Sequence, residues 1–519
     1  MKLASSNGGT FRGTTLAVDG APVHRFLGIP YAQPPSGELR FRPPVALPAW
    51  AGVVDATEYG AAAPQNPDAA DPDEAPLAWS EDGCLNLNVW TPGTGGTARP
   101  VMVWFHGGAY LMGANSDGMY DGARLAAAAG TVVVAINYRL GALGFLLLAH
   151  LLGEGFEDSS NLGLLDQLEA LRWVRDNIAG FGGDPHNVTL FGESAGAAAI
   201  GTLLGMPASE GLFNRAIMQS GTAERFRTPE ASARVTAEFL RLCGLDESSV
   251  GELPALPVER LLAAQQQLEG RIAAENYAVP LPFQPTVGTP SLPEPPLDAV
   301  RNGLNSGVDL LVGTNLNEGS FAVEMRPDRP EDPDYPDRAA AVLSAGGLPG
   351  DCAPGYAEAL AAVLAREPRG KELLEAAIAD AVYRQPSNNL LDARLQSARS
   401  TADGRTFSYL FTWPSPAMGG KLGSCHTLEI PFVFRHLDSP DSAYLTRGKA
   451  PQALSDAISG AWAAFARTGA PDQPGLEWPE YGQQRHTMVL NDPPRPEADP
   501  RRGLRVFFAA NQVRQQPVS

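Results

Sequence analysis

Cysteine is scarce in this 519-residue chain. The four cysteines are Cys84, Cys243, Cys352 and Cys425. No two of them have the spacing of metal ligands or of a redox pair, and four thiols over this length do not form a disulfide framework. We therefore expect no metal site, and thiols that stay reduced as in the cytoplasm.

Basic residues are also few, because 39 lysines and arginines face 58 aspartates and glutamates, which gives a net charge of −19. Proteins that bind nucleic acid present a dense basic patch to the phosphate backbone, and no dense run of lysine and arginine occurs here. We therefore exclude nucleic acid as a partner. Electrostatic steering by an acidic chain favours neutral or cationic small molecules.

Long hydrophobic runs are missing as well. No segment approaches the roughly 18 consecutive apolar residues of a membrane span, and the first nine residues hold no apolar core of a secretory signal. We therefore expect no membrane insertion and a cytoplasmic location. Hydrophobic residues still make up 44% of the chain, which is enough to bury a large core.

Short apolar runs alternate with stretches of helical periodicity. The expected strands are 101–105, 131–136, 188–191, 216–218, 310–312 and 406–411, and the expected helices include 121–129 and 162–178. This alternation predicts an α/β fold with a doubly wound, mostly parallel sheet. Several helical patterns surround a single strand between residues 228 and 399, and we interpret them as capping insertions within one domain that spans residues 1–519.

Ser194 lies at the centre of the only G-x-S-x-G motif in the chain, Gly192 to Gly196. An apolar strand precedes this motif and an alanine-rich, helix-forming run follows it. A serine on such a sharp strand-to-helix turn exposes its hydroxyl above the sheet and places a helix N-terminus at the reacting centre. The sequence therefore predicts Ser194 as a catalytic nucleophile.

A nucleophilic serine needs a base and an acid, which follow it in the order acid then histidine if the fold is an α/β-hydrolase. His426, in a loop of small residues after a strand, is the favoured base, while His436 and His486 stay open as alternatives. Active sites of open α/β sheets lie beyond the carboxyl ends of the strands. Glu318 follows the strand 310–312 and is the expected acid, whereas Asp309 precedes that strand.

The segment His106 to Ala109 follows an expected strand and is rich in small residues. Small residues let backbone amides approach the oxygen of a tetrahedral intermediate. We therefore predict an oxyanion hole made by the N–H groups of Gly108, Ala109 and Ala195. His106 itself is expected to support this loop and not to act as a base.

Together these residues resemble the type-B carboxylesterases, the carboxylesterase/cholinesterase family of α/β-hydrolases, and are most similar to its bacterial members. The motifs that carry the resemblance are 26–32, 80–90, 106–110, 137–139, 161–167, 181–185 with 192–196, 317–319 and 425–429. The resemblance covers nearly the whole chain. It implies a serine carboxylesterase that hydrolyses small-molecule esters through an acyl-enzyme on Ser194, with Glu318 as acid and His426 as base. It implies no metal or organic cofactor.

Two features differ from the family pattern. The motif at Cys84 carries an additional Gly83, and no cysteine precedes Cys84. Secreted members of the family pair this cysteine with an earlier one, so the resemblance implies a free, buried thiol here. Cys425 adjoins the expected base and is interpreted as a packing thiol, with a second nucleophile as the alternative.

Specificity is the least predictable property of this chain. The aromatic residues near the motif loops that could line a substrate pocket are Tyr110, Phe283, Phe321 and Trp413. An amidase or carbamate hydrolase, a lipase, and a non-catalytic cholinesterase-like binding protein stay open as alternatives to an esterase. The sequence does not indicate an oligomeric state.

Overall fold

A computed structural model describes residues 1–67, 77–275, 281–325, 334–397 and 404–512. In this part of the chain a thirteen-stranded sheet has the order β1-β2-β3-β5-β7-β6-β8-β9-β10-β11-β12-β13, with β4 paired to β2. The strands are β1 (Lys2–Ser5), β2 (Thr10–Val18), β3 (Ala21–Pro30), β4 (Val53–Asp55), β5 (Asn86–Thr91), β6 (Arg99–Phe105), β7 (Val132–Ile136), β8 (Gly183–Glu193), β9 (Arg215–Gln219), β10 (Asp309–Asn315), β11 (Thr406–Phe411), β12 (His486–Leu490) and β13 (Arg495–Ala498).

The central strands β7, β6, β8, β9, β10, β11 and β12 run parallel to one another. Antiparallel strands extend the sheet at both ends, β5, β3, β2 and β1 on one side and β13 on the other. This arrangement confirms the predicted fold and all six expected strands. The carboxyl ends of β6, β8 and β10 lie at the same edge, because these strands share one direction.

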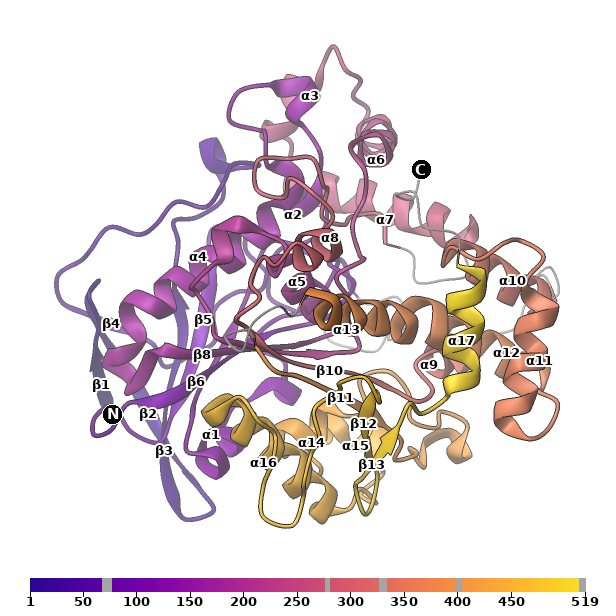
Figure 1. Ribbon diagram of the computed structural model, residues 1–519. Coiled ribbons are helices and arrows are strands. Elements are labelled where there is room, and N and C mark those ends of the chain that lie inside the picture. The colour runs from indigo at the N-terminus through magenta and orange to yellow at the C-terminus, as the bar shows by residue number, and fades with distance from the viewer. Residues whose placement is uncertain (68–76, 276–280, 326–333, 398–403, 513–519) are drawn as a thin grey trace.

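Helices cover both faces of the sheet (Figure 1). One face buries a core against α4 and α5 and against the helices beyond them, and the other face packs against α1, α14 and α16. The helices up to residue 301 are α1 (Ala123–Ala129), α2 (Gly141–Phe145), α3 (Ala149–Leu152), α4 (Leu162–Asn177), α5 (Ala195–Leu203), α6 (Pro229–Leu242), α7 (Val258–Glu275) and α8 (Pro296–Arg301). The expected helices at 121–129 and 162–178 are thus confirmed as α1 and α4.

The later helices include a separate group with its own apolar cluster. Within the described residues, the helices after residue 301 are α9 (Ser320–Glu324), α10 (Tyr335–Ala345), α11 (Ala353–Leu364), α12 (Gly370–Ile378), a π-helical turn (Ala379–Arg384), α13 (Gln385–Ser397), α14 (Ile430–Phe434), α15 (Pro440–Thr446), α16 (Gln452–Thr468) and α17 (Arg502–Asn511). Helices α10, α11 and α12 bury a third cluster that also takes Leu504 and Phe508 from α17. Figure 1 shows this group at one end of the sheet.

The expected capping region, residues 228–399, carries α6 to α13 around the single strand β10. Residues 276–280, 326–333, 398 and 399 of this region lie outside the described residues. The third cluster also includes residues of α17, from the C-terminal part of the chain. The expected boundaries of the capping region do not include this helix. The single-domain organisation stays a prediction.

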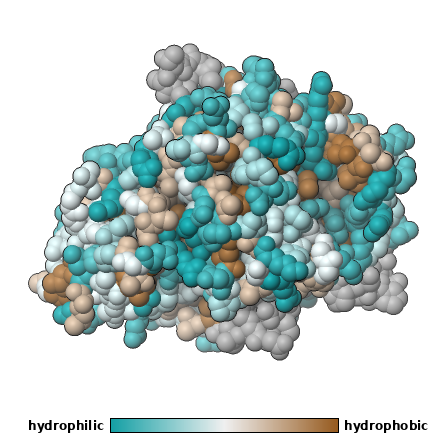
Figure 2. All heavy atoms as spheres, turned by 90° about the horizontal axis from the view of Figure 1, so that it is seen from below, coloured by the Kyte–Doolittle hydropathy of each residue, from teal (hydrophilic) through white to brown (hydrophobic). Residues whose placement is uncertain are grey.

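Figure 2 shows one face of the molecule, on which hydrophilic residues surround small, separated groups of hydrophobic ones. Among the helices that the structure describes, none combines the length and the apolar character required to cross a bilayer.

Candidate active site

Ser194 lies at the junction of β8 and α5, as the motif predicts. Its backbone has φ 54° and ψ −121°, a region that residues with a Cβ rarely adopt. Such strain costs about 1–3 kcal/mol and persists only where the surroundings fix it. The Ser194 N–H donates to the carbonyl of Gln219 on β9 at 2.9 Å, and its carbonyl accepts from Ala198 at 2.9 Å. The side chain remains half-buried and therefore accessible.

Glycines allow the close packing around this turn. A Cβ on Gly196 would lie 2.0 Å from the carbonyl oxygen of Phe105, and one on Gly192 would lie 2.8 Å from the same oxygen. A Cβ on Gly107 would lie 3.2 Å from the Cβ of Ser194. The loop after β6 is therefore in direct contact with the predicted nucleophile.

The predicted oxyanion donors lie on this loop and on α5. Gly108 and Ala109 have φ values of 105° and 57°. Within the described residues, neither of their N–H groups donates to a protein acceptor. Ala195 is the first residue of α5, where backbone N–H groups have no partner inside the helix. The backbone N–H groups of Gly108, Ala109 and Ala195 are thus available as hydrogen-bond donors next to Ser194.

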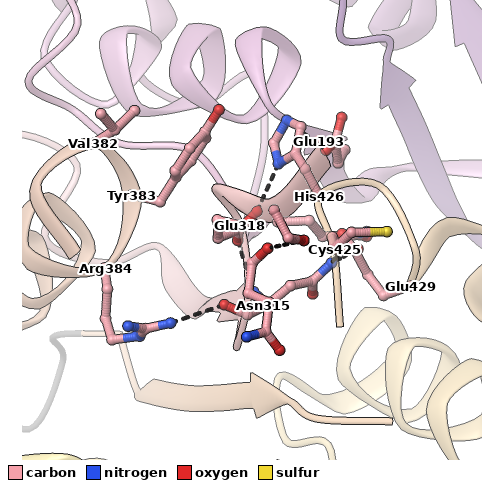
Figure 3. A network of polar contacts seen from close by, with 12 residues as sticks. Glu193, Asn315, Glu318, Val382, Tyr383, Arg384, Cys425, His426 and Glu429 are labelled. Atoms are coloured by element: carbon pink, nitrogen blue, oxygen red, sulfur yellow. Dashed lines mark hydrogen bonds and ion pairs between the residues drawn. The ribbon is translucent and has the colours of Figure 1, made fainter. Parts of the chain in front are cut away.

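The structure brings His426 and Glu318 together across 108 residues of sequence. The Nδ1–H of His426 donates to Oε2 of Glu318 at 2.6 Å (Figure 3). The Asn315 N–H, at the end of β10, donates to the other oxygen, Oε1, at 2.7 Å. The Glu318 side chain is fully buried, while the imidazole is 16% exposed.

The alternative residues lie elsewhere and have other partners. The His436 imidazole is hydrogen-bonded through Nε2 to the carbonyl of Asp121 at 2.7 Å, and His486 begins strand β12. Asp309 begins β10 and lies 3.5 Å from the guanidinium of Arg215. The geometry therefore favours His426 and Glu318 over these candidates.

His106 supports the loop after β6. Its ring stacks on Tyr138 with 4.5 Å between centroids, and its Nδ1 donates to the Gly107 carbonyl at 2.8 Å. The Tyr138 hydroxyl donates to the carbonyl of His106 at 2.7 Å. Burial lowers the pKa of His106 to about 4, so this imidazole is neutral at pH 7.

Glu193, the residue before the nucleophile, faces the second nitrogen of the predicted base. Its Oε1 lies 3.1 Å from Nε2 of His426 (Figure 3). Burial raises the pKa of Glu193 to about 8. Burial alone would lower the pKa of His426, but the charges of Glu193, Tyr383 and Glu318 more than offset it and raise that pKa well above 6.5. Among the described side chains, Ser194 and His426 are not hydrogen-bonded to each other.

A second layer of buried polar groups surrounds Glu193, Glu318 and His426, and the sequence did not reveal this layer. The Asn315 amide donates to Glu429 at 2.6 Å and to the Cys425 carbonyl at 2.7 Å. Glu429 also accepts from Gln219 at 3.1 Å. Burial raises the pKa of Glu429. Glu193 and Glu429 lie inside the motifs that predicted Ser194 and His426, so nearness in sequence was the only available signal.

Tyr383 completes the surroundings of the imidazole. It comes from the π-helical turn, and its ring centroid lies 4.8 Å from that of His426 (Figure 3). No motif marks this residue, because the contact arises only from how the helices pack on the sheet.

The four aromatic residues proposed for a pocket are placed differently from one another. Tyr110 and Phe283 are each 1% exposed, and Phe283 packs against Phe239. Phe321 and Trp413 are half-buried against the second apolar cluster. Tyr110 and Phe283 thus pack within the protein core.

The four cysteines, all within the described residues, are unpaired, and Cys84 is buried as expected. Cys425 is also fully buried, and burial raises the pKa of its thiol to about 12. A thiol in this state is a poor nucleophile. No cluster of three or more His, Cys, Asp or Glu side chains suited to a metal ion occurs among the described residues.

Comparison with known proteins decides the family. The sequence profile of the carboxylesterase family matches residues 2–502. The chain belongs to this carboxylesterase family. It is therefore a carboxylic ester hydrolase with an α/β-hydrolase fold, and the family acts on small-molecule esters.

The relatives of this carboxylesterase match nearly its whole length. Para-nitrobenzyl esterase of Bacillus subtilis is 39% identical over 487 residues, which cover 92% of this chain and 93% of that protein. Phenmedipham hydrolase of Pseudarthrobacter oxydans is 33% identical, covering 88% and 89%. The solved structure of a thermophilic PNB esterase has a TM-score of 0.83 at 38% identity, covering 98% and 99%. A carboxylesterase of Geobacillus stearothermophilus has a TM-score of 0.82 at 33% identity, covering 98% and 100%.

Proposed function

We propose that this carboxylesterase works by two-step acyl transfer, with Ser194 as nucleophile, His426 as general base and acid, and Glu318 as the acid that orients the imidazole. The observation that carries the proposal is the short hydrogen bond from His426 to Glu318 beyond the carboxyl end of β10, in the same site as the strained Ser194 turn.

In the first step the Ser194 oxygen attacks the ester carbonyl while His426 accepts its proton. Nδ1 is engaged by Glu318, so Nε2 is the nitrogen that accepts this proton. The N–H groups of Gly108, Ala109 and Ala195 stabilise the oxyanion of the tetrahedral intermediate. His426 then protonates the leaving alcohol, and an acyl-enzyme remains.

In the second step water attacks the acyl-enzyme and gives its proton to His426. The tetrahedral intermediate collapses, the carboxylic acid leaves, and Ser194 regains its proton from the imidazole. The buried Glu318 carboxylate stabilises the imidazolium in both steps. Its full burial strengthens this interaction, because little water screens it.

Esters of p-nitrophenol test the proposal. Purified protein is assayed on p-nitrophenyl acetate, butyrate and palmitate beside Ser194→Ala, and p-nitroanilides of the same acids serve as amide controls. We expect fast hydrolysis of the short-chain esters, and loss of that activity in Ser194→Ala. Activity that survives in Ser194→Ala would refute the assignment of the nucleophile.

The alternatives predict different outcomes of this assay. Preferential hydrolysis of palmitate would favour a lipase, and faster cleavage of the anilides would favour an amidase. A folded protein without any turnover would favour a binding protein.

We also propose a cytoplasmic location, with a small-molecule ester as substrate and with neither nucleic acid nor membrane insertion. The location is supported by four unpaired thiols, as is usual in reducing compartments. Fractionation of the native host with an antibody to this protein tests it.

A further inference from the structure

Arg384 connects the π-helical turn to the end of β10, which leads to the predicted acid. Its Nη2 donates to the Asn315 carbonyl at 3.0 Å (Figure 3) and to the Leu316 carbonyl at 2.8 Å. Asn315 is the last residue of β10, and its N–H donates to Oε1 of Glu318 at 2.7 Å. The Arg384 side chain is 11% exposed. A buried guanidinium thus holds the segment that leads into Glu318.

The backbone of this segment is fixed from two directions. The Leu316 N–H donates to the Phe411 carbonyl on β11 at 2.9 Å, and the Asn317 N–H donates to the Ser424 carbonyl at 2.9 Å. Among the described residues, no backbone N–H donates to the Leu316 carbonyl, so Arg384 is its donor. Backbone carbonyls in a protein interior require such a partner. The orientation of the peptide group between Leu316 and Asn317 therefore depends on Arg384.

Asp380 holds the guanidinium in this orientation. It begins one helical turn before Arg384 in the same π-helical turn, and it forms an ion pair with Nη1 of Arg384. The Asp380 side chain is 4% exposed, and its other oxygen accepts from the Tyr356 hydroxyl on α11 at 2.7 Å. The planar fork of an arginine can bond a carboxylate and backbone carbonyls at once, which the single nitrogen of a lysine cannot reproduce.

The same π-helical turn also contacts the predicted base. Tyr383, the residue before Arg384, packs its ring 4.8 Å from that of His426, measured between centroids. Figure 3 shows Tyr383 beside the imidazole and Arg384 beside Asn315. Short π-helical segments are rare and often occur at functional sites. Two successive residues of one turn thus contact the base and the segment that carries the acid.

We propose that Arg384 is a positioning residue, which keeps the Glu318 carboxylate aligned with Nδ1 of His426. The inference rests on the proposed function, because it concerns the acid and the base of that mechanism. Among the described residues, the Arg384 side chain bonds to Asp380 and to the two carbonyls, and not to Glu318 or His426. It therefore acts through the backbone. A displacement of about 1 Å at a catalytic group can lower the rate by about 10²-fold.

Substitutions of Arg384 test this role on p-nitrophenyl acetate. Arg384→Met removes the hydrogen bonds to both carbonyls, and we expect about 10²-fold lower kcat with KM nearly unchanged. Arg384→Lys keeps a charge beside Asp380 but lacks the fork, so we expect about tenfold lower kcat. This second variant decides the question if Arg384→Met does not fold.

The pH profile is a readout that a merely structural role would not move. A misaligned Glu318 raises the pKa of His426 less, so the acidic limb of kcat/KM should move to lower pH in both variants. A folded Arg384 variant with unchanged kcat and an unmoved limb would overturn the proposal.

Arg394→Met is the matched control. Arg394 lies on α13, is 4% exposed, and donates to the carbonyls of Ser306 at 2.7 Å and Val308 at 2.8 Å. These residues precede the amino end of β10, away from Glu318. The variant also removes buried hydrogen bonds from an arginine to carbonyls, so we expect a loss of stability in urea without a change in kcat or in the acidic limb. An equal loss of kcat in Arg394→Met and Arg384→Met would indicate general destabilisation and overturn the proposal.

A double-mutant cycle distinguishes failure of this inference from failure of the proposed mechanism. The folded Arg384 variant is combined with Glu318→Gln, and kcat is compared with that of each single variant. If Arg384 acts through Glu318, its substitution should lower kcat no further in the Glu318→Gln background. An undiminished further loss there would overturn the positioning role, even if Glu318 is the acid. Full activity of Glu318→Gln alone would instead refute the proposed mechanism, and the inference with it.

Discussion

Replacing Asp166 with asparagine tests how the protein holds the loop behind the oxyanion segment. Asp166 on α4 accepts three hydrogen bonds from Arg139, at 2.8 Å from Nε, 2.6 Å from a terminal nitrogen and 3.0 Å from the backbone N–H. The side chain of Arg139 is 3% exposed and that of Asp166 is 0% exposed. Arg139 follows Tyr138, which donates to the His106 carbonyl. The pair therefore connects α4 to the active site.

The expected loss is large because asparagine removes the charge and turns one acceptor into a donor that faces the guanidinium. Breaking a buried ion pair on one side costs about 3–5 kcal/mol, since the remaining charge is left uncompensated. Urea denaturation followed by fluorescence measures the change in the free energy of unfolding. We expect Asp166→Asn to lose about 3–5 kcal/mol.

Asp176→Asn is the matched control. Asp176 pairs with Arg175 at 2.7 Å, but both side chains are about half exposed. A pair of this kind contributes about 0–1 kcal/mol. If Asp166→Asn were no more destabilised than Asp176→Asn, the buried pair would not hold the loop and our reasoning would be refuted.

Three further substitutions test the active site. Glu193→Gln removes the carboxyl group that faces Nε2 of His426 and whose ionised form raises the pKa of this imidazole, so the acidic limb of the kcat/KM profile should move to lower pH, and an unmoved limb would contradict this. Glu318→Gln should lower kcat by about 10⁴-fold, because the imidazole loses the carboxylate that fixes its tautomer, and a loss below tenfold would exclude Glu318 as the acid. Gly107→Ala would place its Cβ 2.8 Å from Oε2 of Glu193, 3.1 Å from the Glu193 carbonyl oxygen and 3.2 Å from the Cβ of Ser194. We expect about 10²-fold lower kcat with p-nitrophenyl acetate and, in urea denaturation, a loss of about 1–3 kcal/mol from overpacking; an unchanged kcat would contradict the contact with Ser194.

The parallel part of the sheet could be predicted from the sequence because its strands are continuous apolar runs. Val132–Ile136 and Thr406–Phe411 are buried at every position, as strands covered on both faces must be. Along strand β2, half-buried residues alternate with buried ones in the first half and with exposed ones in the second half, and β13 is largely exposed. These antiparallel strands at the ends of the sheet carry a weaker apolar signal, and we did not predict them.

The predicted site residues were found by local rules, whereas their neighbours depend on long-range packing. Ser194 lies in a turn that its glycines require, and Glu318 follows a strand whose direction was predictable. Tyr383 reaches His426 through a π-helical turn that no pattern marks.

The aromatic residues that we proposed for a substrate pocket show the same limit of prediction from sequence. Nearness to a motif loop does not determine which way a side chain points. Phe283 is 1% exposed and packs on Phe239 in the core.

Trapping the acyl-enzyme tests the central claim most directly. The protein is mixed with p-nitrophenyl butyrate, quenched in acid within milliseconds, and analysed by intact and peptide mass spectrometry beside Ser194→Ala. Our account predicts a single butyryl group on the peptide that contains Ser194, formed at the rate of the p-nitrophenol burst and absent from the variant. A butyryl group on another residue, or an unchanged burst in Ser194→Ala, would contradict it.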